Sequence, residues 1–298
     1  MAGSVRRVPF IAVAALAAVP ALPGTSQMGV YPGLRPLGDL AAPAPAQTDS
    51  GLGVYPALTA PSALAFPGPA ALRSARRYAR SRSGRVSFAV ADERGGVAGV
   101  GIDRPYPAAS LSKAMLLVAF LRREADPTRS ERETLGYMIR LSDNASADAI
   151  YRTLGARPVR DLARAAGMRR FAITDHWAGA TVTAADQARF FLALDDLTPP
   201  RHRAFERELL ETVSPLQTWG IPGVARPRWR VYFKGGWRPE RGTLLEHQAA
   251  YLERGNRRVA IAVLTEGGSD ERFGRATQAG IARRLLAGSD GPLLTSEK

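Results

Sequence analysis

Ser110 and Lys113 are the first pair of residues in this chain whose types and spacing could do chemistry. They lie three positions apart in Ser110-Leu111-Ser112-Lys113, and on a helix that spacing places both side chains on one face. A serine hydroxyl is a weak nucleophile until a base takes its proton, and a neutral lysine in a desolvated site can be that base. The pair predicts covalent catalysis, and the alternative interpretation is a serine that simply caps a helix.

Lysine is rare in this chain, which makes its positions informative. Only three of the 41 cationic residues are lysines, namely Lys113, Lys234 and Lys298, and the others are arginines. A guanidinium stays protonated at any working pH, whereas a partly buried ammonium can lose its proton and act as a base. A lysine in the interior of the sequence therefore marks a position where arginine would not serve.

A second motif, Ser142-Asp143-Asn144, follows a predicted helix that ends at Leu141. The Ser142 hydroxyl could pass a proton to a leaving nitrogen, and the Asn144 amide could hold an amide substrate. These residue types are equally common where a helix stops at a turn, so the motif alone also fits a plain helix end.

A third motif, Lys234-Gly235-Gly236, comes directly after the strand-like segment 229–233. A cation at the end of a strand can bind a substrate carboxylate, and paired glycines let a substrate backbone lie against the strand edge. The alternative interpretation is an ordinary glycine turn that ends the strand.

The elements that must position these motifs change in type along the chain. Alternating apolar residues predict strands at 85–91 and 97–102, and three more at 228–233, 244–251 and 258–265. Helical patterns are predicted at 72–81, 110–123, 130–141, 145–154, 158–166, 183–197, 202–212 and 272–286. Because strands come first and last, we expect an α+β fold in which both ends of the domain build one mostly antiparallel sheet of about five strands, flanked by helices.

The three motifs in this order resemble the serine β-lactamase and penicillin-binding protein superfamily, whose S-x-x-K, S-D-N and K-T-G motifs line one cleft. The resemblance covers roughly 72–286 and is nearest to class A β-lactamases, to which Trp219-Gly220-Ile221-Pro222 is also similar. It implies a β-lactamase/transpeptidase-like fold. Because the interval between the first two motifs is short, it also implies a reduced all-helical subdomain.

The resemblance implies two sets of site residues. The catalytic set supplies the acylated nucleophile, its proton acceptor, the proton shuttle and one backbone N–H of the oxyanion hole, which are Ser110, Lys113, Ser142 and Trp237. The N–H of Ser110 would be the second oxyanion donor. The substrate-binding set consists of Asn144, Lys234, Gly235 and Gly236.

Two features depart from the class A pattern. Class A enzymes carry a loop glutamate that activates the deacylating water, and no Glu-x-x-Leu-Asn occurs here; in the corresponding stretch, 171–177, Asp175 and His176 are the only nearby candidate bases. Gly235 also stands where the superfamily has a threonine, so a hydroxyl that helps to hold a β-lactam carboxylate is missing. Arg238 or Arg241 could compensate, or both could be surface charges.

Composition limits the remaining function classes. The chain has no cysteine, and its three histidines lack metal-ligand spacing, so we expect no metal and no cofactor. The net charge is +14, but the arginines are spread along the chain without a nucleic-acid recognition motif. We expect no nucleic-acid partner; a solvated basic surface would suit contact with anionic cell-envelope polymers.

The chain divides into four predicted parts. An arginine pair followed by an apolar run is typical of a secretory signal peptide, with an uncleaved anchor as the alternative. A stretch rich in proline, alanine and glycine then repeats Gly-Val-Tyr-Pro at 29–32 and 53–56, either as a spacer or as a docking segment. The predicted parts are a signal peptide at 1–23, a linker at 24–70, a serine hydrolase domain at 71–288 and a C-terminal tail at 289–298.

These predictions combine into a main hypothesis and two alternatives. The main hypothesis is a secreted or envelope-bound monomer, acylated at Ser110 by a β-lactam or by a D-Ala-D-Ala-like amide of a peptidoglycan stem peptide. Because the loop glutamate is missing, deacylation is predicted to be slow. The alternatives are a catalytically retired protein that binds cell-wall peptide and a general esterase.

Overall fold

A five-stranded antiparallel sheet organises the protein. The structure, a computed structural model, describes residues 66–240, 242–268 and 270–287. The predicted signal peptide, the repeated Gly-Val-Tyr-Pro segments and the predicted tail lie outside the described residues. The strands are β1 (Arg85–Asp92), β2 (Val97–Val100), β5 (Arg230–Glu240), β6 (Thr243–Arg254) and β7 (Arg257–Gly268). Their order is β2-β1-β7-β6-β5, and all neighbours pair antiparallel.

Both ends of the domain contribute to this sheet, as the sequence predicts. The central strands β1, β6 and β7 are buried along most of their length, and β6 also buries the polar side chains of Glu246, His247 and Gln248. Strand β5 forms one edge of the sheet.

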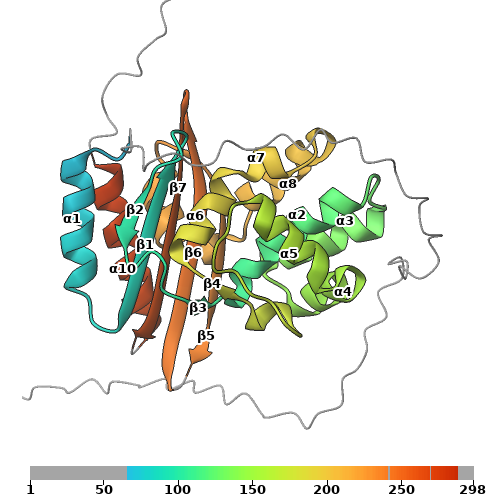
Figure 1. The fold of residues 1–298 in the computed structure, drawn as a ribbon, viewed down its shortest axis with the longest axis horizontal. Coiled ribbons are helices and arrows are strands. Elements are labelled where there is room, and N and C mark those ends of the chain that lie inside the picture. The colour runs from blue at the N-terminus through green and yellow to red at the C-terminus, as the bar shows by residue number, and fades with distance from the viewer. Residues whose placement is uncertain (1–65, 241, 269, 288–298) are drawn as a thin grey trace, which may run out of the picture. The chain divides into compact units, whose positions relative to one another are not determined.

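Helices cover the two faces of the sheet, as Figure 1 shows. One face carries α1 (Pro69–Arg80) and α10 (Glu271–Leu286), which pack on each other. Their contact is close: a Cβ added to Gly280 would lie 2.3 Å from the Tyr78 ring, and the Arg284 guanidinium lies 3.9 Å from the centre of that ring. The other face contacts α6 (Ala184–Leu192) and the helical part of the molecule.

The centre of the helical part is α2 (Ser112–Arg123), whose residues 112–121 are all buried. This confirms the buried central helix expected from its apolar sequence. Around it stand α3 (Arg129–Gly136), α4 (Asn144–Leu154), α5 (Ala156–Ala165), α7 (Leu194–Leu197) and α8 (Arg203–Glu211). None of the helices in the described part of the chain has the length and apolar character that crossing a bilayer requires.

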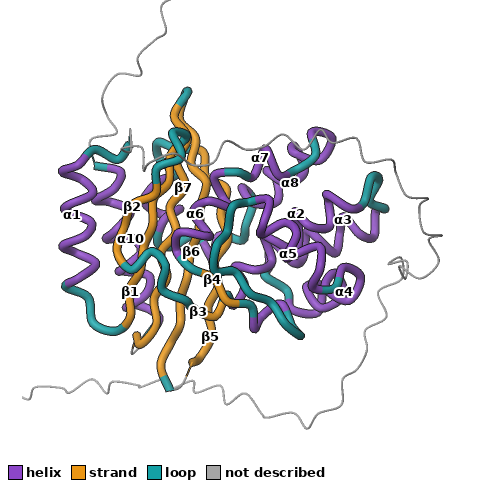
Figure 2. Tube along the Cα trace, in the orientation of Figure 1, coloured by secondary structure: helices purple, strands orange, loops and turns teal. Residues whose placement is uncertain are grey.

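Several predicted elements have different bounds or types in the structure. Figure 2 colours the observed helices, strands and loops. The predicted helix 110–123 starts as the 3-10 turn η2 (Ala109–Leu111) and becomes α-helical at Ser112, and the predicted helix 130–141 ends as the π-helix η3 (Tyr137–Leu141). Strand 228–233 continues to Glu240. The short elements that the sequence did not indicate are β3 (Tyr106–Pro107), β4 (Thr181–Val182), α9 (Ile221–Ala225), η4 (Trp177–Gly179), η5 (Pro200–His202) and η6 (Pro215–Gln217).

Candidate active site

Ser110 lies in the 3-10 turn η2, directly before helix α2. The preceding residue, Ala109, has φ 46°, a left-handed conformation that costs a non-glycine residue roughly 1–2 kcal/mol. Ser110 is half-buried, and its Oγ has no hydrogen-bond partner among the described residues. The turn therefore presents an unengaged hydroxyl at the N-terminal end of a buried helix.

Lys113 connects the first motif to the second. Its ammonium is buried and donates hydrogen bonds to Ser142 O at 2.5 Å, to Ser142 Oγ at 3.3 Å and to Asn144 Oδ1 at 2.7 Å. The structure thus brings these two motifs together, although no described hydrogen bond joins Lys113 Nζ to Ser110 Oγ.

Lys234 connects the third motif to the second. Its ammonium is also fully buried and donates to Ser142 Oγ at 3.0 Å and to Gly235 O at 3.0 Å. Because Ser142 Oγ accepts from both lysines, its own O–H remains available to donate into the cleft.

The local fold of the second motif explains why Ser142 can be reached from two sides. The π-helix η3 ends at Ser142, whose φ of 59° turns the chain sharply. Asp143 then caps α4 by accepting a hydrogen bond from Ser146 N at 2.6 Å. A helix stop and the chemistry proposed from the sequence therefore coexist in the same three residues.

Burial dominates the electrostatics of the two lysines. Desolvation lowers the pKa of Lys113 to about 8, although the carboxylates of Asp143 and Asp148 oppose this shift. Desolvation also lowers the pKa of Lys234 well below its usual value, and the charge of Lys113 lowers it further. Part of the Lys113 population is therefore neutral near physiological pH, as a general base requires.

Strand β5 runs alongside Ser110 and continues through Lys234-Gly235-Gly236, which corrects the expectation that this motif ends a strand. All three residues pair with β6. A Cβ added to Gly236 would lie 2.9 Å from Ser110 N, so only glycine allows the strand to approach the turn so closely. This approach places the backbone of Trp237, the next residue, beside the Ser110 turn, where the resemblance expects the oxyanion hole.

The geometry now has a counterpart among known proteins. A model of the beta-lactamase enzyme family matches residues 124–288, which is more than half of the chain. The chain belongs to the beta-lactamase enzyme family. The match begins after Ser110 and Lys113, so in this family member the first motif is placed by the fold and by its contacts with the second and third motifs.

Solved structures show the same fold. A beta-lactamase from Chitinophaga pinensis is 15% identical with a TM-score of 0.65, and the match covers 74% of this chain and 99% of that one. A beta-lactamase from Sphaerobacter thermophilus is 17% identical with a TM-score of 0.61, over 72% and 95% of the two chains. A mutant of PBP-A, solved as an acyl-enzyme complex with penicillin-G, is 16% identical with a TM-score of 0.62, over 72% and 94%. Among curated protein sequences there is no match. The solved structures confirm the β-lactamase/transpeptidase-like fold.

The loop between the second and third motifs differs from the class A pattern in what it presents to Lys113. The Trp177 ring centre lies 4.7 Å from Lys113 Nζ, and Trp177 Nε1 donates to Asp148 Oδ1 at 2.7 Å. His176 Nε2 contacts the same oxygen at 3.1 Å. In this beta-lactamase family member the loop covers Lys113 with an indole, a group that cannot act as a base.

Of the two candidate bases proposed from the sequence, His176 contacts Asp148, and neither has a described contact with Lys113 or Ser110. Asp175 is exposed, and the His176 side chain is 55% exposed. Sequence reasoning missed Trp177 and Asp148. The only available signal was that Asp148 lies four residues after Asn144, and hence on the same face of α4.

Arg238 and Arg241 are the two arginines that could bind a substrate carboxylate in place of the missing hydroxyl. Arg238 is engaged, because its guanidinium donates to Glu240 Oε2 at 2.6 and 2.9 Å and to Ala178 O at 3.3 Å. Arg241 lies outside the described residues. Arg238 therefore ties β5 to the loop at 178, and three of its five N–H groups are engaged within the protein.

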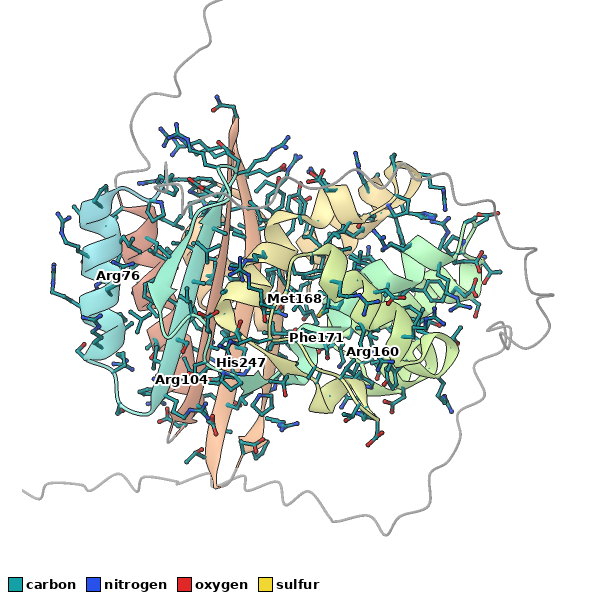
Figure 3. All side chains as sticks on the ribbon, viewed as in Figure 1. Arg76, Arg104, Arg160, Met168, Phe171 and His247 are labelled. Atoms are coloured by element: carbon teal, nitrogen blue, oxygen red, sulfur yellow. The ribbon has the colours of Figure 1, made fainter. Side chains whose placement is uncertain are left out.

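His247, labelled on the sheet in Figure 3, is a structural residue opposite Gly236. Its Nδ1 accepts from Thr265 N at 3.2 Å, so Nε2 carries the proton and donates to Pro107 O at 3.0 Å. Burial lowers the pKa of His247 to about 4. Among the described residues, no group of three or more His, Cys, Asp or Glu side chains could hold a metal ion.

Proposed function

We propose that this protein is a β-lactamase-type serine hydrolase that forms an acyl-enzyme at Ser110 with β-lactams or with D-Ala-D-Ala-like amides. The observation that carries the proposal is the convergence of two buried lysines on one hydroxyl, Ser142 Oγ, beside the unengaged hydroxyl of Ser110. Burying two ammonium groups costs free energy, and in this protein both are buried at one point, beside Ser142 Oγ.

The proposed acylation step assigns a role to each residue of the catalytic set. Ser110 Oγ attacks the carbonyl carbon of the amide or lactam, and neutral Lys113 takes the hydroxyl proton. The N–H groups of Ser110 and Trp237 stabilise the oxyanion. When the C–N bond breaks, the leaving nitrogen takes the proton of Ser142, and a lysine ammonium that donates to Ser142 Oγ replaces it.

Substrate binding is assigned to the residues around this centre. The Asn144 amide accepts from Lys113 through Oδ1, so its NH₂ group remains available to a substrate carbonyl. Lys234, Gly235 and Gly236 form the β5 edge along which the substrate lies.

Slow deacylation is the second part of the proposal. Hydrolysis of the acyl-enzyme needs a base that activates water near the ester. Trp177 covers Lys113 on the side of the loop, and the loop carboxylate of Asp175 is exposed. We therefore expect the acyl-enzyme to persist, as in a penicillin-binding protein, instead of turning over rapidly.

The test is incubation with a fluorescent penicillin followed by intact-mass measurement. The expected result is a long-lived covalent adduct of one penicillin that is absent in Ser110→Ala. If the wild-type protein gives no adduct and no turnover of nitrocefin, the enzymatic proposal is wrong.

A second candidate function has its own supporting observation. Lys113 Nζ is held by acceptors in Ser142 and Asn144 and makes no described hydrogen bond to Ser110. The missing contact supports a second candidate, a catalytically retired protein that binds cell-wall peptide. Binding to purified peptidoglycan that is equal in wild type and Ser110→Ala, without an adduct, would favour it. Export by the N-terminal segment, to the envelope or the medium, is part of both proposals.

A further inference from the structure

A partly exposed pair of tryptophans stands beside the third motif. Trp237 follows Lys234-Gly235-Gly236 in strand β5, and its side chain is exposed although it is large and apolar. The Trp219 ring meets it edge to face, with 6.1 Å between the ring centres and 69° between the planes. Such a pair is a stable arrangement of two indoles.

The backbone and side chain of Trp219 are both held in place. Gln248 on β6 accepts from Ile221 N at 2.8 Å and donates to Trp219 O at 2.8 Å. The intervening Gly220 has φ +66°, and a Cβ there would lie 2.3 Å from Gln248 Oε1. The Arg275 guanidinium lies 5.1 Å from the centre of the Trp219 ring. The surface is therefore preorganised.

Trp237 is one of four large apolar side chains that stay exposed in the described part of the chain, with Tyr137, Leu141 and Leu216. Of these four, Trp237 is the one that contacts a second aromatic ring beside the third motif, that of Trp219. An exposed aromatic pair held in place in this way can serve as a binding surface.

The charges near this surface are already paired. Lys234 is buried and donates to Ser142 and Gly235. Arg275 pairs with Glu271, and Glu246 lies 3.7 Å from its Nε. Where a threonine hydroxyl would project from Gly235, the Trp237 ring is 3.5 Å from the Cβ position. A substrate at this edge meets an indole in place of a hydroxyl.

From these contacts we infer that Trp237 and Trp219 form an aromatic-recognition subsite, so the protein selects acyl donors by a large aromatic group near the scissile carbonyl and depends little on a substrate carboxylate. This inference rests on the proposed acylation of Ser110 and narrows its substrate class.

The test compares acylation rates for three penicillins by intact mass. Benzylpenicillin has an aromatic side chain, 6-aminopenicillanic acid lacks it, and benzylpenicillin methyl ester has no free carboxylate. Burial of a phenyl ring against the subsite should make benzylpenicillin about tenfold faster than 6-aminopenicillanic acid. The methyl ester should react within about threefold of benzylpenicillin, because the described cations at this edge, Lys234, Arg238 and Arg275, each already donate to acceptors within the protein.

Variants of Trp237 give the matched control. Trp237→Ala should reduce the preference for benzylpenicillin over 6-aminopenicillanic acid to about threefold or less, whereas Trp237→Phe, which keeps an aromatic ring, should retain most of it. Equal rates for the two acids in wild type, or a methyl ester more than tenfold slower than benzylpenicillin, would overturn the inference and leave acylation of Ser110 intact.

The two proposals can fail separately. If none of the three compounds forms an adduct, the proposed function fails, and the subsite is tested by binding alone. Phenylacetylglycine should then quench the tryptophan fluorescence of wild type and Trp237→Phe saturably, and quench Trp237→Ala far less. Absence of saturable quenching in wild type overturns the subsite.

Discussion

Lys113 and Lys234 are both buried and both donate to Ser142 Oγ, yet their surroundings differ. Lys113 lies near two carboxylates and under the Trp177 ring, which together stabilise its charged form. Lys234 has only hydroxyl and carbonyl acceptors. At the residue scale, these groups hold the pKa of Lys113 at about 8, whereas burial lowers the pKa of Lys234 well below its usual value. Lys113 can therefore exchange a proton near neutral pH.

Lys113→Arg should reduce the rate of labelling by fluorescent penicillin by roughly 100-fold or more, because a guanidinium cannot accept the Ser110 proton. Lys234→Arg, the matched change at the other buried lysine, should have a smaller effect on that rate. Thermal unfolding of both variants checks that each remains folded. Labelling of Lys113→Arg at the wild-type rate would show that Lys113 is not the base.

The acylation rate should rise with pH. Lys113 is a base only when neutral, and its pKa is about 8, so the neutral fraction grows from about one tenth at pH 7 to about nine tenths at pH 9. We expect about a tenfold faster acylation at pH 9 than at pH 7, measured by single-turnover labelling. A flat profile over this range would contradict the assignment.

Asp148→Asn tests the same assignment from a neighbouring position. The Asp148 carboxylate raises the pKa of Lys113, and asparagine removes its charge but keeps an oxygen that can accept from Trp177 Nε1. The midpoint of the pH profile should therefore move below that of the wild type. A midpoint that stays the same or moves upward would mean that the profile reports another group.

At the scale of elements, the site depends on how closely β5 approaches η2. The third motif is part of the strand, and its two glycines differ in how much space a Cβ atom would have. Gly236 faces the backbone of Ser110 at a distance that leaves no room for a Cβ, whereas a Cβ on Gly235 would make only ordinary contacts of 3.5 Å and longer.

Gly236→Ala should push β5 away from η2 and lower the acylation rate at least tenfold, since a shift of about 1 Å in a catalytic site can cost 100-fold. Gly235→Ala is the matched control and should leave stability unchanged or raise it by up to about 1 kcal/mol, because glycine weakens a strand. Labelling rates and thermal unfolding distinguish the two. Equal effects of both substitutions would contradict the account of the β5 approach.

The sequence was sufficient for features that depend on local pattern, and insufficient for those that depend on contacts across the chain. The five strands and the buried helix α2 follow from apolar periodicity, and the motif spacing identified Ser110, Lys113, Ser142 and Lys234. The strand continuing past Lys234 was missed because two glycines resemble a turn. Gly236 is explained only by Ser110, which lies far away in sequence, and Trp177 became a site residue only through its contact with Lys113.

For the molecule as a whole, strands from both ends of the domain build the sheet, and α1 and α10 cover one of its faces. Although Arg275 of α10 also contacts Trp219, the contact between α1 and α10 can be perturbed separately. Gly280 is its closest point, because the Tyr78 ring occupies the space beside it.

Gly280→Ala should lower the free energy of unfolding by about 1–3 kcal/mol, as expected for overpacking. Gly136→Ala is a control in another helix, where a Cβ would meet nothing within 4 Å, and it should stabilise by up to about 1 kcal/mol. Chemical denaturation measures both. The folded fraction of either variant should be acylated at the wild-type rate, and a large loss of acylation in Gly280→Ala would show that α1 and α10 influence the cleft.

The shared hydrogen bonds of Ser142 have a consequence for how the molecule works as one unit. Lys113 belongs to the helical part and Lys234 to the sheet, and a single oxygen atom, Ser142 Oγ, joins them. The arrangement of the three motifs therefore depends on how the helical part lies against the sheet. We expect a displacement of the two parts by an ångström or two to break one of these hydrogen bonds and to stop the proposed acylation before the fold itself is lost.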